Sequence, residues 1–329
     1  MLKTIFNYCA RSLDYPVGAN PKDSYLKGNH YFLDLSQVFE RFPFNHLIFD
    51  EYGIARYDYG RVRQPNMSLG LQYNSTYICW WALSRLEIYL KTADEQAKEG
   101  FLKHVNWLQS NQQKLKGCSV WPFRFNYLPE LHWLRSPWIS GMDQGLIISV
   151  LVRAFKLTKD NRFLDTAKSA GLFFAVPLEQ GGFRTEFAKN DHYYEMYPVK
   201  PLSKVLDGFV FSLMGLFDLL SVWKDSRIEG LYQEGLSTLR KHVDFWDFRG
   251  YWSRFGTYYL SPPWYHKINY AWMRVLSDIT QDAYFGKVAD HWNPARLSDS
   301  LRAKVKIYSY LFSRKHYLKR SLLIKIKGI

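Results

Sequence analysis

The feature that most constrains the fold is an internal repeat of about sixty residues. Four segments share one plan, in which a strongly apolar helix is followed by a short turn and a second, amphipathic helix. The first three then continue into a loop rich in Gly, aromatic residues and Arg. Their starts, at residues 77, 144, 207 and 266, lie 67, 63 and 59 residues apart. Self-similarity at a nearly fixed period indicates stacked helical hairpins that bury one another's apolar faces.

The two helices of each pair differ in where their apolar residues lie. The first helices are apolar on nearly all sides, as residues 147–155 illustrate, and helices of that kind are buried. The second helices carry one stripe, for example Phe163, Ala167, Ala170 and Phe174. An inner ring of buried helices within an outer ring of amphipathic ones is an α/α toroid. We therefore predict a mainly α fold, an incomplete barrel of about four helical hairpins, with an open solenoid as the alternative.

The two ends of the chain depart from this repeat. Short apolar runs at 30–35, 46–60 and 62–74 are broken by Gly, Pro and Asn, which is typical of strands and turns. We expect residues 1–75 to form an arm containing a short β-hairpin, residues 76–300 to form the toroid, and residues 301–329 to form a basic amphipathic tail.

The charge of the chain points to an anionic partner. The net charge is +14, from 44 Lys and Arg against 30 Asp and Glu, and 18% of the residues are aromatic. Such a balance suits nucleic acid, an anionic lipid surface or an acidic polysaccharide. Nine of the positive charges lie at 302–329, which leaves +5 on residues 1–301. A body this mildly basic disfavours nucleic acid. The tail either packs one face on the body or contacts a membrane or a biosynthetic complex.

Several protein classes are excluded by what the sequence lacks. Its three cysteines are far apart, so neither a disulfide framework nor a Cys-based zinc module is expected. The sequence has no run of 18 apolar residues and no recognisable signal peptide. We expect a cytoplasmic protein, with peripheral attachment to the inner membrane as a variant. The HExxH, GxGxxG, Walker and GxSxG motifs are also absent.

Polar residues gather where each inner helix is expected to begin, which in a toroid is one rim. The loops return to the same rim and carry arginines. Arginine pairs with carboxylates bidentately, and aromatic rings provide flat surfaces for sugars. This combination favours an acidic sugar polymer as the ligand. The candidate binding residues are Arg124, Asp143, Gln144, Arg184, Asp207, Arg254 and His266.

Three segments carry a resemblance to a known family. They are SPWISGMDQGLIISVLVRAFKLTKD at 136–160, EMYPVKPLSKVLDGFVFSLMGLFDL at 195–219 and YHKINYAWMRVLSDIT at 265–280. Over roughly residues 45–300 the chain resembles the D-glucuronyl C5-epimerases, which convert glucuronate to iduronate in heparosan and heparan sulfate precursors. The resemblance implies the family's helical domain, an anionic polysaccharide substrate, a homodimer, and no metal or organic cofactor.

The implied reaction removes the C5 proton next to a carboxylate and returns it on the opposite face. Such a reaction needs two proton-handling groups and nearby positive charge. The resemblance implies that Tyr197 and Tyr265 are catalytic, with Glu195 as the nearby acid. Met196 stands where the family has an acid and Phe255 where it has a third tyrosine. Tyr258 is the candidate to replace that tyrosine.

Three other functions stay open on the sequence. A polysaccharide lyase shares the first proton abstraction and then expels the C4 substituent. A non-catalytic glycan-binding protein is consistent with Met196 and Phe255, since neither side chain can move a proton. A glycosidase needs two carboxylates flanking a cleft, and Asp143, Glu195 and Asp207 supply candidates.

Overall fold

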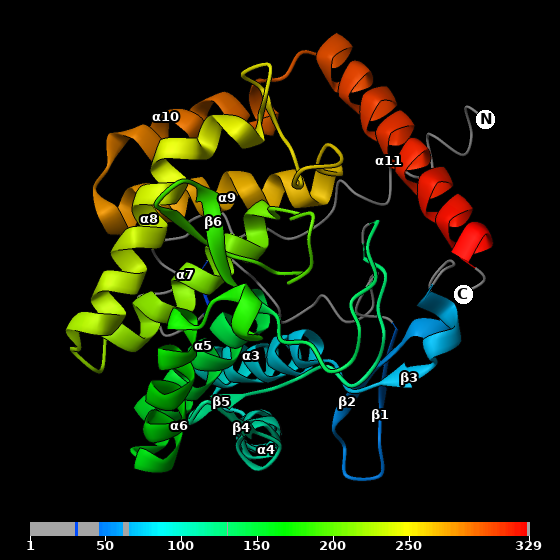
Figure 1. Ribbon diagram of the computed structural model, residues 1–329. Helices are drawn as coiled ribbons and strands as arrows, with labels where there is room; N and C mark the ends of the chain where they lie inside the picture. The colour runs from blue at the N-terminus through cyan, green and yellow to red at the C-terminus, as the bar shows by residue number, and fades with distance from the viewer. Residues whose placement is uncertain (1–29, 32–45, 62–65, 130, 328–329) are drawn as a thin grey trace.

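The computed structural model describes residues 30–31, 46–61, 66–129 and 131–327 of the 329-residue chain. Its main body consists of helical hairpins arranged around a common core (Figure 1). The four pairs are α3 (Ser75–Thr92) with α4 (Glu95–Ser110), α5 (Gly141–Thr158) with α6 (Asn161–Leu172), α7 (Leu206–Leu220) with α8 (Ser226–Trp246), and α9 (Pro263–Thr280) with α10 (Ala283–Trp292). The predicted α/α toroid of four hairpins is confirmed.

Short local signals set the turn inside each hairpin. The inner helices α3, α5 and α9 each end at a residue with left-handed backbone, namely Ala93, Lys159 and Gln281. The next residue is in each case an aspartate whose carboxylate accepts the backbone N–H two residues later, and Asp225 caps α8 in the same way. Such caps satisfy N–H groups that a helix start leaves unpaired. The sequence Thr-x-Asp therefore marks three of the four turns.

Inner helices α5 and α7 pack unusually closely. A Cβ added at Gly145 would collide with backbone atoms of Phe211 and Ser212, and a Cβ added at Gly215 would collide with the backbone of Gly145. Gly141 in turn faces Ser212, so the two helices run parallel and begin at the same end. Only glycine allows two helix backbones this close, because any side chain would force them apart.

The centre of the ring is closed by aromatic side chains and a buried ion pair. The Phe211 ring lies 5.3 Å from Trp80 and 4.9 Å from Trp272, which joins α3, α7 and α9. Arg153 on α5 donates to Asp218 on α7 at 2.6 Å. The hydroxyl of Tyr31 donates to the same carboxylate at 3.0 Å, so an N-terminal residue is bound inside the toroid.

Small sheets surround the helices. Strands β1 (Leu47–Phe49), β2 (Ala55–Asp58) and β3 (Leu71–Gln72) form an antiparallel sheet in that order, in which Tyr57 pairs with both Leu47 and Gln72. The remainder of the expected arm, at 1–29, 32–45 and 62–65, lies outside the described residues. His104 on α4 accepts the Ala55 N–H at 3.2 Å, which fixes the sheet to the outer ring.

The Gly, aromatic and Arg loops form two-stranded hairpins that lead back to the inner helices. These are β4 (Gln113–Leu115) with β5 (Cys118–Val120), β6 (Arg184–Ala188) with β7 (Asp191–Tyr194), and β8 (Asp247–Phe248) with β9 (Trp252–Ser253). We use "rim" for the end of the toroid formed by the first turns of α3, α5, α7 and α9 and the segments that lead into them.

Helix α11 (Asp299–Lys327) follows the last hairpin. In Figure 1 it runs from the side of α9 and α10 toward the side that carries β3. Its first turns pack on a small cluster that contains Trp252, Leu260 and Leu297. Among the described residues, no helix is both long enough and apolar enough to cross a membrane.

Candidate functional site

The first turns of α3 and α5 are joined at the rim by Asp143. Its carboxylate accepts hydrogen bonds from the hydroxyls of Ser75 at 2.8 Å and Thr76 at 2.7 Å. Burial raises the pKa of Asp143, and these hydrogen bonds oppose the rise. The side chain is only 3% exposed. Asp143 therefore holds two inner helices together, and a direct contact with substrate stays a prediction.

Gln144 and His266 also have partners inside the fold. Gln144 donates to the carbonyl of Ser119 at 2.7 Å. His266 is fully buried, stacks on Trp252 at 3.6 Å, and its Nδ1 accepts the Ser253 N–H. Burial lowers its pKa to about 3, so the ring is neutral at physiological pH. These buried contacts hold both side chains inside the fold next to the rim. A binding role for either residue stays a prediction.

Glu195 lies at the end of β7, where it connects three parts of the rim. Its backbone carbonyl accepts the Gly141 N–H at the start of α5, at 2.9 Å. Its carboxylate accepts the Lys204 N–H at 3.2 Å, just before α7. Glu195 is fully buried. This geometry suits a residue that positions its neighbours.

Asp207 is in the first turn of α7 and has an unusual carboxyl group. It is 4% exposed, and its Oδ1 has no hydrogen-bond partner among the described residues. Burial raises its pKa to about 7, which the backbone N–H groups of Gly208 and Asp207 only partly offset. A carboxyl that titrates near neutrality can both accept and release a proton under physiological conditions.

Tyr197 lies against an aromatic cluster formed by the N-terminal sheet and the 123–138 segment. The cluster packs Tyr57, Tyr59, Phe123, Phe125, Leu134 and Trp138 together, with Tyr127 and Tyr197 at its edge. The rings of Tyr127 and Tyr197 are 6.2 Å apart. The half-buried Tyr197 thus has a fixed apolar wall beside it.

Tyr265 lies in the first turn of α9 and is held by two rings. Its ring centroid is 4.6 Å from Phe255 and 3.5 Å from Trp264. Tyr77 of α3 stacks on Tyr57 at 4.0 Å. Burial raises the pKa of Tyr77 well above its usual value, and the hydroxyls of Tyr57, Tyr59 and Tyr265 add to the rise. Tyr77 thus packs on the aromatic cluster beside Tyr197 and interacts electrostatically with Tyr265.

The three arginines are not equivalent. Arg184 forms an ion pair with Glu234 on α8 at 2.7 Å, so its charge is already balanced by a carboxylate of the outer ring. Arg124 is exposed beside the Phe123–Trp138 bridge. Arg254 is half-buried and pairs through its backbone with Leu260. Of the predicted trio, Arg184 thus already has a carboxylate partner on α8 in this structure.

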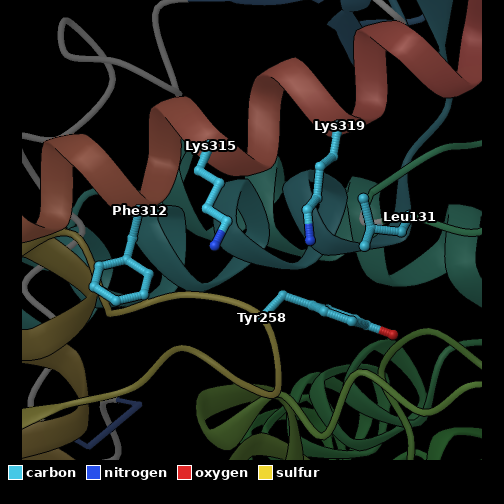
Figure 2. A pocket seen from close by; sticks show the side chains of 5 residues that line it. All are labelled: Leu131, Tyr258, Phe312, Lys315 and Lys319. Carbon is cyan, nitrogen blue, oxygen red and sulfur yellow. The ribbon is translucent and has the colours of Figure 1, made fainter.

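Tyr258 lines a surface pocket of about 100 Å³ together with residues far away in sequence. The other lining residues are Leu131, Phe312, Lys315 and Lys319. Figure 2 shows both lysines pointing from α11 toward the Tyr258 ring. This brings the basic tail next to a candidate catalytic residue, a contact that the sequence did not predict.

Sequence reasoning also missed the tyrosines of the aromatic cluster. Tyr57 in β2 and Tyr59 in the turn that follows it are both buried, so their spacing of two was an available signal for one inward face. Burial raises the pKa of Tyr57 to about 12. These phenols are neutral at physiological pH, and because they are buried they hold the aromatic cluster together. Within the described ranges, no group of three His, Cys, Asp or Glu residues is placed to hold a metal ion.

Comparisons with known proteins first define the fold class. A solved GH76 α-mannanase from Bacteroides thetaiotaomicron is similar, with a TM-score of 0.52 and 12% identity over 88% of this chain and 81% of that one. At such low identity the similarity concerns the fold alone. The helical toroid is therefore shared with a protein of unrelated sequence.

The sequence comparisons are more specific. Residues 116–294, more than half of the chain, match the family described as D-glucuronyl C5-epimerase C-terminus. A D-glucuronyl C5-epimerase of Caenorhabditis elegans is 33% identical over 222 residues, which is 60% of this chain and 35% of the worm protein. An uncharacterised protein of Methanocaldococcus jannaschii is 26% identical over 170 residues, 51% of each chain.

The chain belongs to the D-glucuronyl C5-epimerase family. The matched region spans about a third of the length of the worm enzyme and about half of the archaeal protein. The family match at residues 116–294 contains Tyr197, Tyr258 and Tyr265. Strands β1 to β3 and helix α11 lie outside it.

Proposed function

We propose that this protein is a C5-epimerase that converts glucuronate to iduronate residues within an acidic polysaccharide such as heparosan. Family membership carries the proposal. The arrangement of the rim supports it, since Tyr197 lies at the edge of the aromatic cluster on which Tyr77 packs, and Tyr265 lies in the first turn of α9.

In the proposed mechanism a phenolate of one tyrosine removes the C5 proton, and the hydroxyl of the other returns a proton to the opposite face. Tyr197 and Tyr265 lie on different segments, one before α7 and one in α9, and the proposal assigns them to opposite faces of the sugar ring. The positive ends of the inner helices favour the negative charge that develops on the sugar carboxylate.

A tyrosine acts as a base only when its pKa falls well below the ordinary value of about 10. The cationic side chains of the rim, Arg124 and Arg254, are the candidates to lower it. Asp207 is a further proton-handling candidate, because its pKa lies near 7. Tyr127, the half-buried ring at the edge of the aromatic cluster, would support a sugar ring next to the reacting residue.

The direct test is incubation of the protein with heparosan in heavy water. Epimerisation places deuterium at C5 of the uronate, which NMR or mass spectrometry detects, without cleaving the chain. Formation of unsaturated uronate ends would instead identify a lyase. Binding without either product would identify a non-catalytic glycan-binding protein and would contradict the proposal.

A further inference from the structure

Helix α11 presents one continuous stripe of side chains toward the body. The stripe advances by alternating steps of four and three residues, which keeps its members on one helix face. Leu301, Val305 and Tyr308 form its first half, and they pack on the cluster around Trp252 and Leu260. The second half of the stripe consists of Phe312, Lys315 and Lys319, which line the pocket beside Tyr258.

The stripe on α11 changes from apolar residues to lysine where it reaches the pocket beside Tyr258. A helix face that packs on a protein core is normally apolar, yet two positively charged residues occupy it here. Both lysines are exposed, and both point toward Tyr258 in Figure 2. Among the ion pairs formed by the described residues, none involves Lys315 or Lys319. The charges therefore lie over a cleft without a carboxylate partner from the described part of the chain.

The pocket suits a small anionic group attached to a larger molecule. Its volume of about 100 Å³ holds several water molecules, and one wall is the flat ring of Tyr258. Two ammonium groups on one side and an aromatic ring on the other are the features that bind a sugar carboxylate. Leu131 comes from the segment that leads to α5, so the pocket joins α11 to the rim.

We propose that Lys315 and Lys319 form an anion subsite that binds a uronate carboxylate of the polymer beside Tyr258. This inference rests on the proposed function for its substrate. It assigns the basic tail to substrate binding, and it adds to the site a helix that lies outside the matched family region.

The experiment compares two double variants of the full-length protein. Lys315→Gln/Lys319→Gln removes the subsite charge, and glutamine preserves helix propensity. Lys304→Gln/Arg314→Gln removes the same charge from exposed positions of α11 that do not line the pocket. Lys315→Arg/Lys319→Arg keeps the charge. Binding of heparosan is measured by calorimetry at low salt, and KM and kcat are measured by deuterium incorporation at C5.

We expect the subsite variant to bind heparosan about three- to tenfold more weakly, as two exposed ion pairs would allow, with KM rising by the same factor and kcat within twofold. The control and the arginine variant should remain near wild type. Equal losses in the subsite and control variants, or no loss in either, would overturn the inference. So would loss of binding to anionic lipid vesicles with heparosan binding intact, because that result assigns the lysines to a membrane.

The binding measurement separates this inference from the proposed function. A wild-type protein that binds heparosan through these lysines but incorporates no deuterium contradicts epimerisation and supports the subsite. If the wild-type protein incorporates deuterium into heparosan and all variants have the same KM as wild type, the result supports epimerisation and contradicts the subsite.

Discussion

Met196 packs directly against Gly208 in the first turn of α7. A Cβ built on Gly208 would lie 2.8 Å from the Cβ of Met196, closer than two such carbons can approach. The residue before the candidate catalytic Tyr197 is thereby held against the helix that carries Asp207. Met196 thus contacts the residue next to Asp207, whose pKa lies near 7.

Gly208→Ala should therefore disturb both stability and the site. Overpacking at a tight contact typically costs about 1–3 kcal/mol, and a shift of Met196 would displace Tyr197. We expect a lower unfolding midpoint in urea and a reduced rate of deuterium incorporation. Gly230→Ala in α8 is the matched control, because no atom lies within 4 Å of its added Cβ. That variant should be neutral or slightly more stable, and equal behaviour of the two would contradict the packing argument.

Asp207 should make stability depend on pH. Its pKa of about 7 in the folded protein exceeds its ordinary value of 3.8, so between these values the folded state retains a proton that the unfolded state releases. The contribution of this group to stability therefore falls as the pH rises from about 4 to about 7. Asp207→Asn should unfold like wild type near pH 4 and be more stable at pH 8, by a few kcal/mol at most, since one pKa unit is worth about 1.4 kcal/mol. Parallel stability curves from pH 4 to pH 8 would show that Asp207 titrates normally.

Removing the hydroxyl of either candidate catalytic tyrosine should abolish most turnover and spare the fold. Tyr197→Phe and Tyr265→Phe retain the rings that contact Tyr127, Phe255 and Trp264. Loss of a proton-transfer group typically costs about 10²–10⁴-fold in rate, measured here as deuterium incorporation with the melting temperature as a check on folding. Tyr194→Phe is the control, because its buried hydroxyl donates to the Leu231 carbonyl on the outer ring. A rate that survives both catalytic substitutions would exclude the tyrosine mechanism.

The buried Arg153–Asp218 pair should be essential to the ring but remote from the chemistry. Removing one partner of such a pair leaves a buried charge and costs about 3–5 kcal/mol. Asp218→Ala should therefore lower the unfolding midpoint strongly, while any folded protein keeps its KM for heparosan. Glu179→Gln breaks an exposed pair with Lys200 and should leave the midpoint unchanged. A mild effect at Asp218 would indicate that water reaches this part of the core.

The repeat and the hairpins could be read from local sequence. Helix periodicity follows from which residues are apolar, and the two-residue turns follow from an aspartate that caps the next helix. Both signals act between residues a few positions apart, so spacing alone reports them. The same local logic located the first turn of each inner helix, and with it Asp143, Asp207 and Tyr265 near one rim.

Which partners those rim residues have inside the fold was decided by tertiary packing. Gln144 donates to the Ser119 carbonyl and His266 accepts the Ser253 N–H, whereas Oδ1 of Asp207, like Oε1 of Gln144 and Nε2 of His266, has no hydrogen-bond partner among the described residues. Arg184 donates to a glutamate 50 residues later in the sequence, on the outer ring, and its role in substrate binding stays a prediction. No local pattern encodes such pairings, because each depends on how distant segments dock.

The sequence by itself determined a four-hairpin helical ring with a polar rim, because apolar periodicity and helix capping are local properties. Only the tertiary structure brought Trp80 and Trp272 against Phe211 and placed Lys315 and Lys319 over Tyr258. These contacts join residues 57 to 131 positions apart in the sequence. Their proximity results from closing the ring and packing α11 on it, which is a property of the whole chain.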